Sequence, residues 1–259
     1  MTNKNKLVSI FNENADLYDK YRPGYSDDVI DHIISSSGMK RGAHILEIGC
    51  GTGQITKPFA EKGFKILCLE KGKKLARLAS SNLNQFSEIE VNNIAFENWE
   101  PLNNHFDLFL SAQAFHWIKT DLGIKIAGDV LKKDGTLCLV WHLDKSQDTE
   151  FWKATIPVYA KYMTVKTEKP SLDESKNMYM NAIESDPNFD FPDVKLFSYE
   201  KKYSTSEYMG LLNTFSDHMT MKIEKRACFF NEIRDIIISK NGEVNRKYET
   251  IVITSKKVQ

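Results

Sequence analysis

The chain has 259 residues, of which 41% are hydrophobic and 27% are charged, so one full-sized domain with a modest insertion is expected. Lysine plus arginine balance aspartate plus glutamate at 35 each, which leaves no overall positive charge to attract DNA or RNA. The sequence has no apolar run long enough to span a membrane and no apolar core of a signal peptide near its start. We therefore expect a cytoplasmic protein, monomeric or homodimeric, whose partner is neither a nucleic acid nor a membrane.

The first 143 residues alternate between helix-like and strand-like segments. Residues 26–38 are typical of a helix, because Ser26 can cap its start and Gly38 can end it. Further helices are expected from Ile55 to Gly63, around Leu75 to Ala79, and from Asp121 to Gly135. Apolar runs predict strands over residues 44–50, 65–70, 89–94, 106–113 and 135–143.

The apolar runs are continuous, without strict alternation of apolar and polar residues, which is typical of strands buried on both faces of a parallel sheet. Two later segments, residues 194–204 and 247–257, predict strands that flank a helical stretch over residues 206–239 and pair antiparallel at the sheet edge. The sequence therefore predicts an α/β fold with a seven-stranded, mostly parallel sheet and helices on both faces. Ligands of such sheets bind at the carboxyl ends of the strands.

Residues 145–193 break this alternation, because they are polar, rich in aromatic residues and helical in pattern. We interpret them as a helical cap inserted between a main domain of residues 1–144 and 194–259. Its aromatic and methionine side chains, Trp152 among them, would cover an acceptor pocket and exclude water. The alternative is that these side chains form only the core of the segment itself.

Three glycines follow the first predicted strand at alternate positions, Gly49, Gly51 and Gly53. Glycine lets a ligand touch the main chain, and such a turn between a strand and a helix suits a nucleotide-like ligand. Dinucleotide sites use G-x-G-x-x-G, but the third position of that pattern is Gln54 here. Glu47 would repel a pyrophosphate and could receive an ammonium group. The pattern therefore favours a ligand that carries an amino acid over NAD.

The stretch "LEIGCGTG" (residues 46–53) resembles the first motif of class I S-adenosylmethionine-dependent methyltransferases, E/D-x-G-x-G-x-G. Glu70 follows 21 positions after Gly49, where a carboxylate can accept both ribose hydroxyls. The resemblance implies a Rossmann-like fold, S-adenosyl-L-methionine as cofactor and S-adenosyl-L-homocysteine as product. It also implies cofactor contacts in three groups: Glu47, Gly49, Cys50, Gly51, Gly53 and Gln54 in the loop, Glu70 at the ribose, and Ala95, Phe96 and Glu97 at the adenine. Asn93 is an alternative adenine contact, or it ends its strand.

Three further segments resemble small-molecule methyltransferases of the type 11 group. They are "FNENADLYDKYRPGY" (residues 11–25), "AQAFHW" (residues 112–117) and "YMGLLNTFSDH" (residues 208–218), the last being similar to a segment of the trans-aconitate methyltransferase-like subgroup. By this resemblance Tyr18 and Arg22 fold over the cleft. Arg22 would pair with the methionine carboxylate or with an acidic acceptor. The alternative is that Arg22 and Pro23 only end a helix.

Methyl transfer from a sulfonium mainly requires alignment, and a base is needed only when the acceptor is a neutral hydroxyl or amine. His116 is the candidate catalytic base, or it orients the cofactor or the loop. Gln113 would contact the cofactor or the acceptor, and Trp117 would pack under the adenine or wall the pocket. Tyr208 and His218 complete the expected acceptor pocket with His116, Trp117 and Trp152. No metal site is expected, since the four cysteines lack the spacing of metal ligands.

The resulting hypothesis is an S-adenosylmethionine-dependent methyltransferase that acts on a small molecule, with a carboxylate favoured as acceptor by analogy alone. Nucleic-acid amino methyltransferases carry N/D-P-P-Y/F after the fourth strand, whereas this chain has Ser111-Ala-Gln-Ala-Phe there. Two alternatives remain open at this point. The first is a protein that binds the cofactor without turnover, and the second is a nicotinamide-dependent oxidoreductase.

Overall fold

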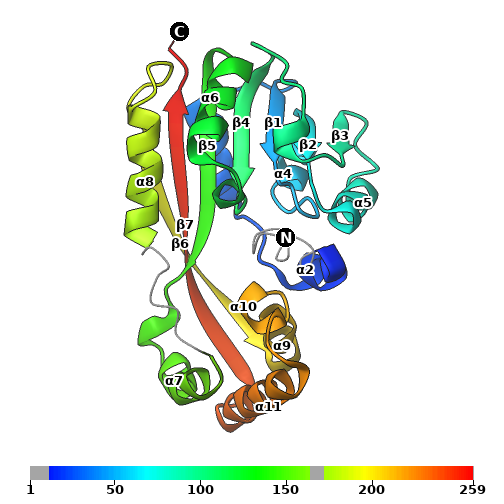
Figure 1. Ribbon diagram of the computed structural model, residues 1–259, viewed down its shortest axis with the longest axis vertical. Helices are drawn as coiled ribbons and strands as arrows, with labels where there is room; N and C mark the ends of the chain where they lie inside the picture. The colour runs from blue at the N-terminus through cyan, green and yellow to red at the C-terminus, as the bar shows by residue number, and fades with distance from the viewer. Residues whose placement is uncertain (1–11, 164–171, 259) are drawn as a thin grey trace.

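The computed structural model describes residues 12–163 and 172–258. Its central feature is a seven-stranded sheet with the order β3-β2-β1-β4-β5-β7-β6 (Figure 1). The strands are β1 (His44–Ile48), β2 (Lys65–Leu69), β3 (Ile89–Asn92), β4 (Phe106–Ala112), β5 (Leu131–Asp144), β6 (Asp193–Ser204) and β7 (Glu243–Lys256). The first five are parallel, and β7 pairs antiparallel with both β5 and β6. The predicted mostly parallel sheet with its antiparallel edge is confirmed.

Helices cover both faces of the sheet, as predicted. One face packs against α3 (Asp27–Ser37), α4 (Thr56–Glu61) and α5 (Lys73–Asn82), and the other against α6 (Thr120–Val130) and α8 (Leu172–Glu184). In β1, Ile45 belongs to the hydrophobic cluster on the face covered by α3, α4 and α5. The next residue, Leu46, belongs to the cluster on the face covered by α6 and α8. Burial on both faces explains why the strands are apolar throughout.

The predicted helix from Asp121 to Gly135 is wrong at its end, because α6 stops at Val130 and β5 begins at Leu131. Leu131 is buried and pairs with Phe106 of β4, and the pairing then shifts so that Leu108 faces Thr136. Asp134 takes a left-handed backbone with φ of 63° inside this irregular start. Sheet pairing of Leu131 therefore overrides the helical pattern of the following charged residues.

A second lobe lies at one end of the molecule, beside the carboxyl ends of the parallel strands (Figure 1). It contains α7 (Glu150–Tyr162), α9 (Thr205–Leu212), α10 (Ser216–Met219) and α11 (Ile223–Ser239). Its core also takes residues from the long strands β6 and β7, such as Tyr203 and Val244. The two strands thus run continuously from the main sheet into the second lobe.

The segment over residues 145–193 contributes to both parts of the molecule. Its helix α7 packs against α11 in the second lobe, whereas Tyr179 and Ile183 of α8 join the hydrophobic cluster on the α6 face of the sheet. The ring of Tyr179 stacks on Trp141 of β5 with centroids 4.8 Å apart. The two helices of this segment therefore have different surroundings. The expected division into a main domain and a single cap stays a prediction.

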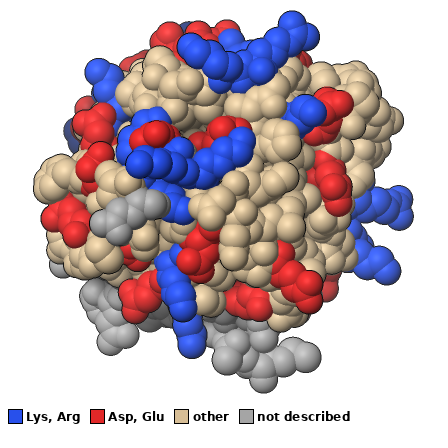
Figure 2. Space-filling model, turned by 90° about the horizontal axis from the view of Figure 1, so that it is seen from above, with Lys and Arg blue, Asp and Glu red and all other residues tan. Residues whose placement is uncertain are grey.

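The charged surface is mixed in sign. On the face drawn in Figure 2, lysine and arginine side chains are interspersed with aspartate and glutamate side chains. None of the helices in the described ranges is both long and apolar enough to cross a membrane. Within the same ranges, no group of three or more His, Cys, Asp or Glu side chains is placed to hold a metal ion.

The remaining short elements lie around the sheet edge that holds the glycine loop. They are α2 (Ala15–Tyr21) and the 3-10 turns η1 (Phe96–Asn98), η2 (Phe115–Trp117) and η3 (Ser146–Asp148). The turn η2 follows β4 directly, and its Phe115 is fully buried. Phe115 packs over α6 at Gly123, where an added Cβ would lie 2.6 Å from the ring.

This packing predicts that Gly123→Ala destabilises the protein. Alanine in a helix gains about 1 kcal/mol over glycine, but overpacking a rigid core ring costs about 1–3 kcal/mol. We expect a net loss in the free energy of unfolding, measured by urea denaturation. The matched control is Gly24→Ala, because no atom lies within 4 Å of the Cβ position there. Equal stability of the two variants would contradict the packing argument.

Candidate active site

The loop between β1 and α4 brings bare backbone to the carboxyl edge of the sheet. Gly49, Gly51 and Gly53 all take left-handed backbone angles, with φ of 71°, 59° and 95°. A Cβ on Gly49 would clash with the Cβ of Ala114, which follows β4. A Cβ on Gly53 would lie 3.1 Å from Leu83 of the segment after α5. The loop therefore needs glycine both for its conformation and for its close packing.

The Glu70 carboxylate fastens this loop to the end of β2. One of its oxygens accepts a hydrogen bond from the Gly51 amide at 3.0 Å, and the other accepts from the Gly72 amide at 2.7 Å. Burial raises the pKa of Glu70, and these backbone amides oppose that effect. Asn93 donates its side-chain amide to the carbonyl oxygens of Glu70 and Lys71. Asn93 thus secures the turn after β2.

A cavity of about 700 Å³ opens in front of this loop. One of its walls contains Gly49, Gly51 and Glu70, and Phe96 and Glu97 line it beyond the end of β3. Gln113, His116 and Trp117, which follow β4, also line it. The structure thus brings together most of the residues expected to hold a nucleoside. Ala95 and Gly53 are described residues that do not line it.

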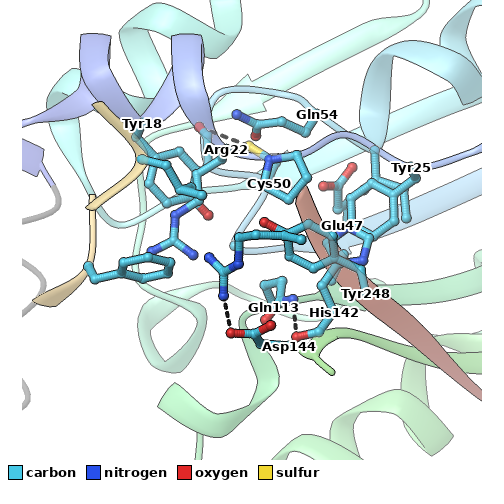
Figure 3. A pocket seen from close by; sticks show the side chains of 18 residues that line it. Tyr18, Arg22, Tyr25, Glu47, Cys50, Gln54, Gln113, His142, Asp144 and Tyr248 are labelled. Atoms are coloured by element: carbon cyan, nitrogen blue, oxygen red, sulfur yellow. Dashed lines mark hydrogen bonds and ion pairs between the residues drawn. The ribbon is translucent and has the colours of Figure 1, made fainter. Parts of the chain in front are cut away.

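A second cavity of about 120 Å³ lies between the glycine loop and the long strands β5 and β7 (Figure 3). It is lined by Glu47, Cys50 and Gln54 from the loop side. His142, Asp144, Arg246 and Tyr248 line it from the strands, and Leu211 and Phe215 from the second lobe. The smaller cavity is therefore bounded by both parts of the molecule.

The two cavities share a wall made of six residues, Tyr18, Arg22, Gly49, Gly51, Ala112 and Gln113. Gln113 directly follows β4 with a left-handed φ of 57°, and its backbone amide donates to the carbonyl oxygen of Val140 at 2.8 Å. Its side-chain amide donates to the carbonyl oxygen of His142 at 3.3 Å. A group that crosses from one cavity to the other must pass this wall.

Glu47 is buried beneath the loop and lines the smaller cavity. Thr56 donates its hydroxyl to one carboxylate oxygen at 2.8 Å. Burial raises the pKa of Glu47 to about 7, although the Thr56 hydrogen bond opposes this. Glu47 is therefore poised to ionise near neutral pH, and a cationic group placed beside it would favour the charged form.

Two arginines face the smaller cavity. Arg22 donates to the carbonyl oxygen of Thr214 at 2.9 Å and lies over the ring of Phe215, 4.6 Å from its centroid. Its Nε is buried and has no hydrogen-bond partner among the described residues. Arg246 forms an ion pair with Asp144. The two guanidinium groups are close enough for Arg246 to lower the pKa of Arg22, although burial is the main cause of that shift.

His142 also lines the smaller cavity, but both of its ring nitrogens are engaged. Nδ1 lies 2.8 Å from the hydroxyl of Thr250, and Nε2 lies 3.1 Å from the carbonyl oxygen of Gly24. Burial lowers the pKa of His142 to about 4. The ring is therefore neutral at neutral pH and braces the wall.

Three residues expected in the acceptor pocket do not line either cavity, although all three lie in the described ranges. Trp152 stacks on Tyr159, and Tyr208 packs edge-on against Phe151. His218 is buried, with its Nε2 3.3 Å from the hydroxyl of Tyr159. Burial lowers the pKa of His218 to about 4. These side chains lie in or against the core of the second lobe.

Sequence reasoning missed the residues that β5 and β7 contribute, above all Asp144 and Arg246. One feature of the sequence could have found Arg246. Val244, Arg246 and Tyr248 are the buried positions in an alternating stretch of β7. A lone arginine on the apolar side of an alternating strand requires an anionic partner or ligand.

Comparisons with known proteins agree with this geometry. A family model described as a methyltransferase domain matches residues 45–135, from β1 into β5. An uncharacterized methyltransferase of Schizosaccharomyces pombe is 24% identical over 250 residues, which cover 93% of this chain and 94% of that protein. The malonyl-[acyl-carrier protein] O-methyltransferase of Acetivibrio thermocellus is 27% identical and is covered to 95%, with 99% of this chain aligned. Several further uncharacterized methyltransferases match over about half of their own length.

Among solved structures, a putative type II methyltransferase from Anaeromyxobacter dehalogenans has the same fold, with a TM-score of 0.67 at 17% sequence identity. That similarity covers 92% of this chain and 99% of the other. Together these similarities support an S-adenosylmethionine-dependent methyltransferase. The larger cavity of this methyltransferase lies at the carboxyl ends of the parallel strands, where ligands of open α/β sheets bind.

The buried Glu47 predicts a pH-dependent stability of this methyltransferase. Its folded pKa, about 7, is above the ordinary value of 4.5, so the folded state keeps a proton that the unfolded state releases. The stabilisation is complete below the unfolded pKa and is lost as the pH rises through the folded pKa. We expect the free energy of unfolding of Glu47→Gln, relative to that of the wild type, to rise by up to about 3 kcal/mol between about pH 5 and about pH 8, because the wild type loses stability over this range. Urea denaturation without ligand at several pH values measures this, and a difference that stays constant with pH would contradict it.

Proposed function

We propose that this methyltransferase binds S-adenosyl-L-methionine in the larger cavity and methylates a carboxylate of a small organic acid bound in the smaller cavity. The observation that carries the proposal is the shared wall, since a methyl group must pass between two adjoining sites. The donor supplies a methyl group on a sulfonium. The acceptor oxygen forms the new O–C bond while the S–C bond breaks, which gives a methyl ester and S-adenosyl-L-homocysteine without release of a proton.

The residues around the larger cavity suit the nucleoside part of this donor. Phe96 is nearly fully buried and offers an apolar wall for the adenine, with Glu97 and the backbone at Ala95 beside it. Glu70 offers carboxylate oxygens to the ribose hydroxyls at the end of β2. The Gly49 to Gly53 loop leaves room for the ligand to contact the main chain.

The methionine part would extend to the shared wall. Its ammonium group would lie near Glu47, which can ionise in response to the positive charge. Its carboxylate would pair with Arg22, which lines both cavities and has an unpartnered Nε. Tyr18 and Gln113, which line both cavities, would hold the sulfonium end in position.

A carboxylate acceptor needs no base, and among the residues that the structure describes no free histidine lines the smaller cavity. His142 is neutral with both nitrogens engaged, and His116 lines only the larger cavity. His116 stays the candidate base for a hydroxyl or amine acceptor. The similarity to a malonyl-[acyl-carrier protein] O-methyltransferase, an enzyme whose name states methyl transfer to oxygen, supports the choice of acid over amine.

Other parts of the proposal rest on the sequence alone. They are membership of the trans-aconitate methyltransferase-like subgroup, a cytoplasmic location and a monomeric or homodimeric state. The predicted cap of residues 145–193 contributes α7 to the second lobe, and this lobe would cover the acceptor, since its Leu211 and Phe215 close one side of the smaller cavity. The alternative is a protein that binds the cofactor without turnover. An assay of methyl transfer distinguishes the two functions.

The proposal predicts that Glu70→Gln weakens binding of S-adenosyl-L-homocysteine by about 10- to 100-fold. Losing the charge removes one or two charge-assisted hydrogen bonds, each worth about 1.5–3 kcal/mol. Isothermal titration calorimetry measures the affinity. The control is Glu90→Gln, an exposed carboxylate on β3 that lines neither cavity. Undiminished affinity in Glu70→Gln would remove the ribose assignment.

A further inference from the structure

The smaller cavity contains two arginines and two acids. Arg22, Arg246, Glu47 and Asp144 line it, and its tyrosines, cysteine and histidine are neutral at neutral pH. With Glu47 ionised, these four charges balance. The methionine part of a bound donor adds a sulfonium, an ammonium and a carboxylate, hence one net positive charge. One negative charge is then missing beside the site of methyl transfer.

Arg22 and Arg246 have different positions relative to the donor. Arg22 comes from the chain just after α2 and lines both cavities, so it can reach the methionine carboxylate across the shared wall. Arg246 comes from β7 and lines only the smaller cavity. A ligand group held by Arg246 therefore lies on the side of the wall away from the nucleoside.

Arg246 is held rigidly for this role. Asp144 pairs with one of its terminal nitrogens, and the other oxygen of Asp144 accepts from the Ser146 amide at 3.0 Å. The guanidinium lies over the rings of Tyr248 and Phe215, 5.1 and 5.7 Å from their centroids. Figure 3 shows the dashed contact from Asp144 at the edge of the cavity, opposite Gln54 and Cys50. The paired carboxylate satisfies part of the planar fork and leaves other donors for a ligand.

We infer that Arg246, positioned by Asp144, determines acceptor specificity by binding a carboxylate of the acceptor. The inference rests on the proposed function and deepens it, since it names the residue that recognises the acid. A carboxylate supplies the missing negative charge. The planar guanidinium also matches the two oxygens of a carboxylate.

The test measures binding of small acids to the protein saturated with S-adenosyl-L-homocysteine. The probes are acetate, malonate, succinate and citrate, with succinamide as an uncharged control and inorganic phosphate as a second anion. Isothermal titration calorimetry first establishes the affinity of each variant for S-adenosyl-L-homocysteine. A wild type that does not bind S-adenosyl-L-homocysteine would overturn the proposed function, and the inference with it.

We expect at least one acid, but not succinamide, to bind the loaded wild type. Arg246→Gln should lose about 100-fold in affinity for that acid, because a buried charged hydrogen bond is removed, while its affinity for S-adenosyl-L-homocysteine stays within about threefold. Arg246→Lys should recover only part of the loss, since it keeps the charge without the fork. Arg22→Gln should instead lower the affinity for S-adenosyl-L-homocysteine.

The matched control is Lys247→Gln, at the next position of the same strand, where the side chain pairs with Asp148 on the surface. It should bind acid as the wild type does. Three results would overturn the inference while leaving the proposed donor site intact. In the first, none of the acids binds to the loaded wild type. In the second, phosphate binds more tightly than every acid. In the third, Arg246→Gln loses as much affinity for S-adenosyl-L-homocysteine as Arg22→Gln does.

Discussion

The site depends on the hydrogen bonds that two backbone amides donate to the Glu70 carboxylate. Through the amides of Gly51 and Gly72, Glu70 joins the loop after β1 to the turn after β2. The loop can approach because Gly49 has no side chain to clash with Ala114. These contacts fix the backbone that separates the two cavities. A donor bound along this loop would therefore have its methyl group positioned mainly by main chain, with few side chains needed for the transfer itself.

The smaller cavity depends on a different property of the fold, the length of its last strands. The antiparallel pairing of β5 with β7 places Asp144 opposite Tyr248, beyond the carboxyl end of β4. Arg246 precedes Tyr248 by two residues in β7, and its guanidinium lies over the ring of Phe215 in the second lobe. One sheet thus supplies both cavities, and the second lobe closes the smaller one.

Much of the fold could be predicted, because parallel strands buried on both faces leave continuous apolar runs in the sequence. The loop after β1 could also be predicted, because Gly49, Gly51 and Gly53 directly follow an apolar run in the sequence. The helix ending at Gly135 was wrong because the pairing of Leu131 with Phe106 is a tertiary effect that helical spacing does not register. Arg246 and Asp144 were missed because their meeting depends on strand register across about 100 residues.

The expected pocket residues Trp152, Tyr208 and His218 show a related difficulty. Aromatic side chains serve equally as core and as pocket lining, and the sequence alone does not distinguish these uses. In the structure they lie in or against the core of the second lobe. The charged residues on the apolar side of a strand are more informative, since burial of an unpaired charge is costly.

The central claim is that a donor bound along the Gly49–Gly53 loop presents its sulfur to the wall shared by the two cavities. A crystal structure of the protein with S-adenosyl-L-homocysteine tests it most directly. The account predicts adenine at Phe96, ribose hydroxyls at Glu70 and the sulfur facing the smaller cavity beside Gln113. A ligand bound elsewhere, or one whose sulfur points away from the smaller cavity, would contradict the account.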